Sequence, residues 1–412
     1  MKINKYFPFV FLYFFINTIG LPSGLLYTTL LTPVFYFWLL SKGKKQILLK
    51  FSICLAPFVL AHLINGVDIG VYIRSVVLLL TVYIFSYTFY TWITTYDDVE
   101  GIFRRLLIAN FLFTLVALCF VLTPYRSLFW LNWSISNAGI AIENWPRLTL
   151  FSYEPSHYAT LLVPFFAYYF IKFILKQREQ NSLLMLMMIV LPLVLSLSMG
   201  VISGLIISIA ILFLLNATRF LGSKKLLYSL SAIVISFIVL FLVLLVFYRN
   251  NPFFVRIMAI VAGKDGSARG RTYEAFYLAY KIAHLKSLVW GIGPGEIKVI
   301  GDPIIKAYYE YPDTYGQVSI PAALAETFAL FGMVGTFIRL FAEVYLFFKT
   351  RVLDNYFRTL LFFYMFVYQF TGSFVTNIAE YVIWILAFTN IFPQFDKQVK
   401  KENIPVNLLS TE

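Results

Sequence analysis

The chain has 412 residues, of which 60% are apolar and 19% aromatic, and its mean hydropathy is +0.80. Soluble domains contain roughly 45–50% apolar residues, so this composition excludes a soluble globular protein and predicts an integral membrane protein. The formal net charge of +13 comes from basic residues scattered over alternate loops, so no nucleic-acid partner is expected. Both cysteines, Cys54 and Cys119, lie in apolar runs, which excludes a disulfide framework.

Apolar runs bounded by charged or turn residues predict an all-α membrane fold with twelve spanning helices. Each span needs about 20 apolar residues. The predicted helices cover residues 6–20, 25–40, 47–64, 71–92, 102–123, 158–175, 182–199, 201–217, 226–248, 322–348, 359–376 and 379–393. The first run lacks a small-residue cleavage site and turns at Gly20–Gly24 into the second, which indicates an uncleaved hairpin and not a signal peptide.

The loop charges predict the orientation of these helices. With a cytoplasmic N-terminus, the inner loops hold most basic clusters, which is the bias that fixes orientation in short loops. These clusters are Lys42/Lys44/Lys45, Arg104/Arg105, Lys172/Lys176/Arg178, Arg219/Lys224/Lys225, Lys349/Arg351/Arg358 and Lys397/Lys400/Lys401. We therefore expect a cell (inner) membrane protein with both termini in the cytoplasm, the C-terminal one as the tail 396–412.

Two long segments interrupt the helices, and this orientation places both outside the cytoplasm. The first, 124–157, lies among the nine helices of residues 1–248, and the second, 249–321, separates those helices from helices 10–12 in 322–395. Loops of this length are usually functional or disordered, and their aromatic and charged content argues against disorder. Within the second segment, aromatic residues from Tyr273 to His284 recur at helical spacing, so a helix there can lie along the membrane surface.

Residues 145–160, WPRLTLFSYEPSHYAT, place three chemically capable side chains, Arg147, Glu154 and His157, at the start of the sixth predicted helix. A carboxylate and an imidazole can transfer protons beside a cation that stabilises negative charge. The alternatives are structural: Glu154 can simply occupy the first helical turn, favoured by the helix dipole, and His157 can be an interfacial residue. Nearby aromatic residues such as Tyr153 can stack on sugars or form an interfacial belt.

Arginines in the two long segments suit a phosphate ligand, because a planar guanidinium makes two-bond contacts with phosphate. Arg147, Arg269 and Arg271 are the candidates, with contact to lipid headgroups as the alternative role. No close cluster of metal-binding residues is present in the sequence, so neither a metal nor a cofactor is expected. Arg339 and Glu343, four residues apart in a predicted span, can pair on one helix face.

Five short motifs follow one another along the chain. They are Arg147…Phe151…Glu154-Pro155-Ser156, Ser196-Leu197-Ser198-Met199-Gly200, Ser267…Arg271, His284…Gly291-Ile292-Gly293-Pro294-Gly295 and Leu324-Ala325-Glu326…Gly332…Gly335. Their order, with twelve predicted spans and one large late loop, resembles the O-antigen polymerase and O-antigen ligase family. A dinucleotide-binding role for the glycine motif is rejected, because no strand–glycine–helix unit surrounds it. A tight turn, or backbone donors aimed at a phosphate, remains open for it.

The resemblance implies a metal-independent glycosyltransferase that uses polyprenyl-pyrophosphate-linked oligosaccharides as donor and acceptor on the outer face of the membrane. It implies polymerisation of repeat units for a surface polysaccharide, with a chain-length regulator and a flippase as further partners. Ligases of the family carry a histidine where this chain has Gln317, which favours a polymerase over a ligase. A lipid-linked oligosaccharide flippase is a third candidate, although the sequence shows no clear internal repeat.

The candidate residues fall into two groups. Those expected to act in catalysis are Glu154, Arg147, Arg271 and His157. Those expected to bind substrate are Arg269, His284, Gln317, Tyr153 and Glu326.

Overall fold

The computed structural model describes residues 7–19, 21, 25–96, 98–137, 140–175, 182–217, 252–262, 270–312, 314 and 316–397. Most of these residues are helical. The helices in the first two thirds of the chain are α1 (Phe7–Phe11), the π-helix η1 (Leu12–Ile16), α2 (Tyr27–Leu30), α3 (Thr32–Ser41), α4 (Ile47–Ile64), α5 (Ile69–Ile93), α6 (Val99–Phe120), the 3₁₀ helix η2 (Pro124–Leu128), α7 (Pro155–Ile174), α8 (Ser182–Leu195), α9 (Met199–Leu215) and α12 (Pro252–Val261).

The later helices include the elements that cap the bundle. They are α14 (Tyr273–His284), η3 (Glu296–Lys298), α15 (Asp302–Tyr309), α16 (Ala323–Lys349), η4 (Val352–Asp354), α17 (Tyr356–Tyr368), α18 (Ile378–Phe388) and η5 (Pro393–Phe395). Each apolar run expected to span the membrane contains helix, except 226–248, which lies outside the described residues. The expected helix 25–40 is divided at Leu31 into α2 and α3.

Five of the described helices are long and apolar enough to cross a membrane: α4, α5, α6, α7 and α16. Six shorter apolar helices of 10–17 residues accompany them in the described residues of the chain. The protein is therefore a membrane-embedded helical protein, as its composition predicted.

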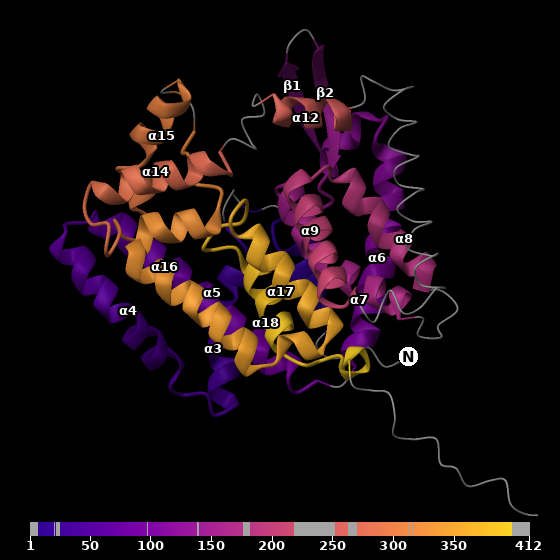
Figure 1. Ribbon diagram of the computed structural model, residues 1–412, viewed down its shortest axis with the longest axis horizontal. Coiled ribbons are helices and arrows are strands. Elements are labelled where there is room, and N and C mark those ends of the chain that lie inside the picture. The colour runs from indigo at the N-terminus through magenta and orange to yellow at the C-terminus, as the bar shows by residue number, and fades with distance from the viewer. Residues whose placement is uncertain are drawn as a thin grey trace, which may run out of the picture.

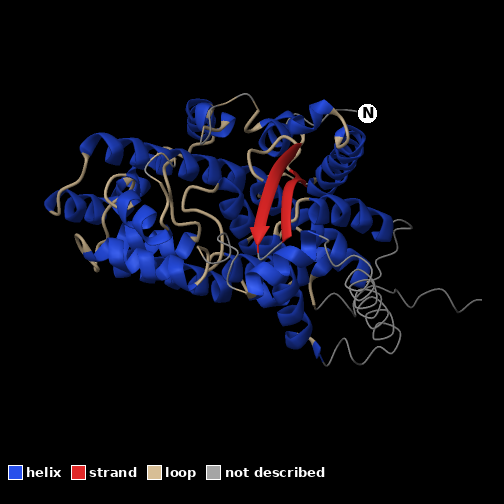
Figure 2. Ribbon diagram, turned by 90° about the horizontal axis from the view of Figure 1, so that it is seen from above, coloured by secondary structure: helices blue, strands red, loops and turns tan. Residues whose placement is uncertain are grey.

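A β-hairpin interrupts the otherwise helical fold, and it was not expected. Strands β1 (Trp130–Asn137) and β2 (Ile140–Leu148) pair antiparallel, with Leu131 opposite Arg147. Figure 2 shows the two strands side by side beside the helix ends. β-branched and aromatic residues favour extended backbone, and the Trp130 indole N–H donates to the carbonyl of Ala117 in α6 at 2.8 Å. The described residues of 124–157 are thus fastened to the bundle through this hairpin.

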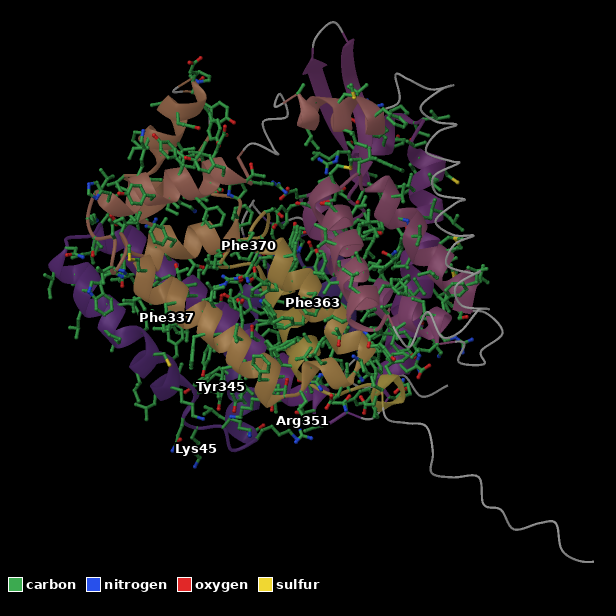
Figure 3. All side chains as sticks on the ribbon, viewed as in Figure 1. Lys45, Phe337, Tyr345, Arg351, Phe363 and Phe370 are labelled. Carbon is green, nitrogen blue, oxygen red and sulfur yellow. The ribbon has the colours of Figure 1, made fainter. Side chains whose placement is uncertain are left out.

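The described parts of the two long segments occupy the same end of the molecule. In Figure 1 the hairpin, α12, α14 and α15 all lie at the upper end of the helices. Figure 3 places Lys45 and Arg351, from two of the basic loops, at the opposite end. This arrangement agrees with the alternation of basic and long loops on which the predicted orientation depends.

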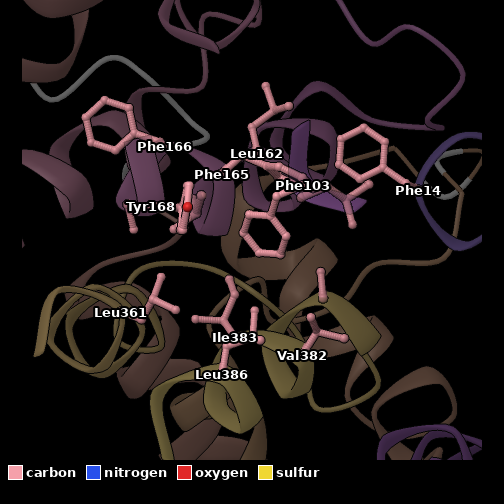
Figure 4. Close-up of a cluster of buried hydrophobic side chains, with 14 of the residues drawn as sticks. Phe14, Phe103, Leu162, Phe165, Phe166, Tyr168, Leu361, Val382, Ile383 and Leu386 are labelled. Carbon is pink, nitrogen blue, oxygen red and sulfur yellow. The ribbon is translucent and has the colours of Figure 1, made fainter. Parts of the chain in front are cut away.

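Helix α7 runs through the centre of the bundle, and nearly all of its residues are buried. In Figure 4, Leu162, Phe165 and Tyr168 of α7 pack with Phe103 of α6 and face side chains of α17 and α18, including Ile383. Inside a membrane such close packing replaces the hydrophobic effect as the force between helices. A rigid central helix gives a fixed position to Glu154, the residue that precedes its first turn.

Helix α16 is broken at Gly332, and residues 288–293 repair the break. The carbonyls of Ala329 and Leu330 accept from the amides of Ile292 and Gly293, both at 3.0 Å. In return, the amides of Met333 and Val334 donate to the carbonyls of Leu288 and Val289 at 2.9 and 3.1 Å. The inserted segment therefore satisfies the backbone groups that the kink frees.

This insertion explains the first glycine of the motif at 291–295. Gly291 has φ +76°, and a side chain there would overlap the Leu330 carbonyl, whereas Gly332 has φ +65° and closely approaches Val289. Only glycine allows both the backbone conformation and the contact. Of the two roles left open for the motif, the structure supports the tight turn, because the amides of Gly291, Ile292 and Gly293 already donate within the protein.

Candidate functional site

Glu154 stands at the N-cap position of α7, directly before Pro155. Its backbone is extended (φ −146°, ψ 140°), and its side chain makes no capping hydrogen bond to the helix. Instead, one carboxylate oxygen, Oε1, accepts a 2.5 Å hydrogen bond from the Ser156 hydroxyl. Proline at the first helical position needs no capping partner for its nitrogen. The Glu154 carboxylate therefore does not act as a side-chain cap of α7.

Arg271 meets Glu154 from the second long segment. The Arg271 Nη2 atom lies 3.6 Å from Glu154 Oε1, and the two side chains are 22% and 34% exposed. A tight charge-assisted hydrogen bond is about 2.7–2.9 Å long, so this pair is loose and partly open to solvent. The two long segments thus bring an arginine and a carboxylate together without closing them off.

A narrow recess surrounds this pair, and we call it the entrance recess. It is lined by Tyr153, Glu154, Ser156, His157, Thr160, Arg271, Pro321, Tyr368, Ser373, Phe374 and Asn377. The His157 ring is buried and stacks on the half-exposed Tyr153 ring, with 4.9 Å between ring centroids. Its Nδ1 atom has no hydrogen-bond partner among the described residues. The structure therefore groups four of the sequence-predicted residues at one place: Tyr153, Glu154, His157 and Arg271.

Arg147 lies on strand β2, next to the turn between α8 and α9. Its Nε donates to the carbonyl of Ser196 at 3.1 Å, and its Nη2 to that of Leu197 at 3.4 Å. The same turn approaches Arg271, since a side chain at Gly200 would lie 3.9 Å from the Arg271 Nη1 atom. Residues 196–200 therefore accept hydrogen bonds from Arg147 and lie close to Arg271, which places the second of the five sequence motifs beside the site.

A larger pocket adjoins the entrance recess on the other side of Arg271, and we call it the cap pocket. Its volume is about 380 Å³. It lies between α14, α15 and the segment 311–321, and Gln317 is on its wall. Arg271 and Pro321 line both cavities. Two of the predicted site residues, Arg271 and Gln317, thus share one pocket.

Glu326 does not line the entrance recess but positions one of its walls. Its Oε2 atom accepts a 2.7 Å hydrogen bond from the amide of Val375, in the connection between α17 and α18. The amide of Ala323 donates to the carbonyl of Gly372 in the same connection at 3.0 Å. Ser373, which lines the recess, has a positive φ of +69°. Glu326 is therefore a positioning residue for this loop.

The remaining predicted residues lie elsewhere. His284 is exposed at the end of α14 and stacks on Tyr280, with ring centroids 6.1 Å apart. Arg269 lies outside the described residues. The helix that ends at His284 is as predicted, with Ala275, Leu278, Ala279, Ile282 and Ala283 buried. Of its aromatic residues, Tyr273 and Tyr280 are exposed, whereas Phe276 packs against the hydrophobic cluster beneath it.

Sequence reasoning missed the recess residues from α17 and the connection after it. Tyr368, Ser373, Phe374 and Asn377 come from the stretch 368–377, YQFTGSFVTN, which was expected to be mostly a spanning helix. Its polar residues interrupt two apolar runs, and that interruption is the signal that could have indicated a loop at the site. Helix α17 ends at Tyr368.

A second arginine–carboxylate cluster lies within the helices, and we call it the helix network. Arg339 of α16 donates from Nε to Glu343 at 3.2 Å and to Gln369 at 2.9 Å, from Nη1 to Thr327 at 3.0 Å, and from Nη2 to Glu380. The expected pairing of Arg339 with Glu343 is confirmed, and it belongs to a set of contacts that joins α16, α17 and α18. Ionisable residues in membrane helices usually pair in this way.

Searches against protein-family models and against curated proteins find no match for this chain. Among the described residues, no group of three or more His, Cys, Asp or Glu side chains is arranged to hold a metal ion. The entrance recess, the cap pocket and Arg271, which lines both, are therefore the features that bear on function.

Proposed function

We propose that the protein is a membrane glycosyltransferase that polymerises polyprenyl-pyrophosphate-linked oligosaccharide repeat units into a surface polysaccharide. The observation that carries this proposal is the loose ion pair of Glu154 and Arg271, which lies between a recess and a pocket at one end of a membrane helix bundle. The resemblance of the ordered motifs to O-antigen polymerases and ligases supplies the substrate class.

The reaction that such a site performs is displacement at an anomeric carbon. The hydroxyl oxygen of an acceptor sugar forms a new bond to the anomeric carbon of the donor. The bond from that carbon to the pyrophosphate oxygen breaks, and its electron pair leaves with the pyrophosphate. Because pyrophosphate is already a good leaving group, positioning the two lipid-bound sugars is the main task of the protein.

Arg271 and Arg147 have the chemistry to bind the departing pyrophosphate. Each guanidinium offers five N–H donors in a fixed plane. The bonds of Arg147 to the 196–200 turn use two of its nitrogens and orient the group, while the loose contact of Arg271 leaves it available to an anion. Fixed donors of this kind stabilise the charge that develops on a leaving group.

Glu154 is the proposed general base. Its carboxylate takes the proton of the attacking hydroxyl, and Ser156, which donates to Oε1, fixes its direction. His157 is the second candidate, because its Nδ1 has no partner among the residues that the structure describes. Both residues belong to the first turn of one rigid helix or directly precede it, so their separation does not depend on a flexible loop.

In the proposed topology, twelve spans place both termini in the cytoplasm and residues 249–321 outside the cell membrane. The arrangement of basic and long loops at opposite ends of the bundle supports it. Reporter fusions at Lys225 and Gly301 test it: they should report opposite sides of the membrane. Reporters on the same side would remove the basis for an outward-facing site.

A ligase that transfers the glycan to a lipid or protein acceptor is the alternative, and a flippase is the less favoured one. Gln317 on the cap pocket wall supports the polymerase, since the resemblance implies a histidine there in ligases. The purified protein with lipid-linked repeat units as its only substrate should form polymer on the lipid. A requirement for another acceptor would indicate a ligase, and absence of any transfer would contradict the enzyme proposal.

The proposal also has a consequence in cells, because each function leaves a different glycan at the surface. A strain that lacks the gene should display single repeat units if the protein is a polymerase. Accumulated lipid-linked polymer would indicate a ligase, and loss of all external lipid-linked glycan would indicate a flippase. A chain-length regulator and a flippase are the partners that polymerisation would require.

A further inference from the structure

The cap pocket has walls of mixed chemistry. Aromatic rings form one wall, where Tyr309 and Tyr311 stack with 5.5 Å between centroids. Aliphatic side chains from α14 and α15, including Leu278 and Ile305, form another. At about 380 Å³ the pocket is within the range of roughly 300–1,000 Å³ that small-molecule sites occupy.

Two polar side chains on the pocket wall are accessible and have no bonded partner. Gln317 and Ser319 are both exposed, and neither makes a hydrogen bond to another residue that the structure describes. Val318 and Ile320, which alternate with them, are buried in a hydrophobic cluster with α14 and α15. This alternation holds the amide and the hydroxyl toward the open side of an extended segment.

The segment that carries these groups is fastened to α15. The Oδ1 atom of Asp302 accepts a 2.9 Å hydrogen bond from the amide of Val318, and its Oδ2 atom lies 2.9 Å from the Lys306 ammonium. Gln317 and Ser319 flank the residue held by this bond. This bond to α15 therefore fixes the backbone of Gln317 and Ser319 before any ligand binds, which reduces the entropic cost of binding.

Charge narrows the class of ligand. Arg271 is the only charged side chain among the described residues of the pocket wall, and the proposed function assigns it to the pyrophosphate. An anionic ligand would compete for the guanidinium that faces the recess. The remaining surface matches a ligand that has an apolar face and several hydroxyl groups. The apolar face can pack on the tyrosine rings, and the ligand's hydroxyl groups can bond to Gln317 and Ser319.

We propose that the cap pocket binds one uncharged sugar residue of the glycan, next to the site of bond formation at Glu154 and Arg271. The proposal rests on the proposed function for the source of the sugar, and on the pocket itself for its chemistry. Because Arg271 lines both cavities, a sugar in the cap pocket is adjacent to the group that contacts the pyrophosphate. The pocket then selects the repeat unit, while the recess performs the transfer.

Saturation-transfer difference NMR on the full-length protein in nanodiscs tests this with soluble probes. The probes are the methyl glycosides of glucose, galactose, N-acetylglucosamine and rhamnose, with glycerol as a polyol that lacks a ring. At least one glycoside should give saturable transfer, and glycerol should not. Since one hydrogen bond contributes about 0.5–1.5 kcal/mol, Gln317→Ala should weaken binding of that glycoside by about 2- to 12-fold.

Matched control variants separate the pocket from the rest of the surface. Tyr311→Ala should weaken binding more than Gln317→Ala, whereas Tyr273→Ala and Gln46→Ala, which alter exposed residues outside the pocket, should leave it unchanged. Thermal unfolding of each variant shows whether the fold persists, and Tyr311→Phe retains the ring if the alanine variant fails to fold. Saturable binding that Gln317→Ala and Tyr311→Ala both leave intact would overturn the proposal.

The result can be separated from that of the proposed function, because the probes carry no lipid or pyrophosphate. Glycoside binding by a protein that transfers no sugar would overturn the proposed function and leave the pocket standing. Polymerisation by a protein that binds none of the glycosides would overturn the pocket alone.

Discussion

The protein contains two arginine–carboxylate clusters with opposite properties. In the helix network, Arg339 contacts side chains of α16 and α18 and Gln369, which directly follows α17, and the Glu380 side chain is only 1% exposed. In the entrance recess, Arg271 and Glu154 are 3.6 Å apart and 22% and 34% exposed. One cluster has its donors committed within the protein, and the other presents them at a cavity.

This difference separates a structural role from a functional one. A buried ion pair stabilises little in net terms, but removing one partner leaves an unpaired charge and is strongly destabilising. A partly exposed pair contributes little to stability, so its position at a cavity suits the binding of a ligand. We therefore expect mutations in the two clusters to have different effects: loss of fold in one, and loss of activity without loss of fold in the other.

The largest effect on stability is expected for Arg339→Leu. It leaves Glu343 and Glu380 without their cation inside the helices, which should lower the free energy of unfolding by about 3–5 kcal/mol. Unfolding in detergent, followed by circular dichroism, measures the change, and protein abundance in the membrane should fall with it. An Arg339→Leu protein of normal stability would remove the distinction between the two clusters.

Arg271→Ala should reduce polymer formation about 10²–10³-fold, which is the typical loss when one donor to a developing charge is removed. Arg271→Lys should recover only some of the activity, because a point charge cannot reproduce a planar two-bond contact. Polymer yield per folded protein is the measurement. Full activity of the lysine variant would indicate a role in binding lipid headgroups.

Gly291→Ala tests whether the insertion of residues 288–293 at the α16 kink supports the part of the protein that carries the cap pocket. The added side chain would overlap the backbone of Leu330 and occupy a positive φ, so we expect a loss of about 1–3 kcal/mol in unfolding free energy. Gly316→Ala is the matched control, because no atom of the described residues lies within 4 Å of its added side chain. Equal melting temperatures for the two variants would show that the insertion at the α16 kink does not stabilise this part of the protein.

The smallest effect concerns pH. The backbone amide of Val318, and then the Lys306 ammonium, hold the pKa of Asp302 below its ordinary value of about 3.9. A carboxyl with a lowered folded-state pKa contributes stability above its unfolded pKa and loses it as pH falls through the folded value. Glycoside binding should therefore weaken slightly below about pH 4, and Asp302→Asn should abolish that dependence. If glycoside binding by Asp302→Asn still weakens below about pH 4, a group other than Asp302 causes the dependence.

Much of the helical architecture could be predicted from local sequence. Helix α4 has the predicted bounds 47–64, because charged and turn residues flank its apolar run. The hairpin was missed, since the prediction for 124–157 depended on charge and length and not on strand pattern. The kink at Gly332 could not be predicted, because its cause is a segment about 40 residues earlier that inserts into the helix.

The site was predictable in composition but not in pairing. Glu154, His157 and Arg271 were all singled out by residue type and motif, but the sequence placed Arg147 as the cation beside Glu154, whereas the structure pairs Glu154 with Arg271. That contact joins residues far apart in the sequence, one at the start of α7 and one directly before α14. The role of Glu326 in holding the loop at Val375 likewise depends on a tertiary contact. Residue chemistry is thus visible in the sequence, whereas the partners are set by the fold.

The central claim is that Glu154 reacts and is not merely a residue at a helix start, and turnover by Glu154→Gln tests it most directly. A general base contributes typically 10²–10⁴-fold, whereas loss of a cap or dipole contact alters stability by about 0.5–2 kcal/mol. Glu343→Gln is the matched control, because it makes the same change in the helix network.

Purified wild-type and variant proteins should be compared at saturating lipid-linked repeat units, with turnover expressed per folded protein. We expect Glu154→Gln to lose about 10²–10⁴-fold in turnover at an unchanged melting temperature. Glu343→Gln should instead lower the melting temperature and retain its turnover per folded protein. Near-native turnover by Glu154→Gln would contradict the assignment of the entrance recess as the reaction site.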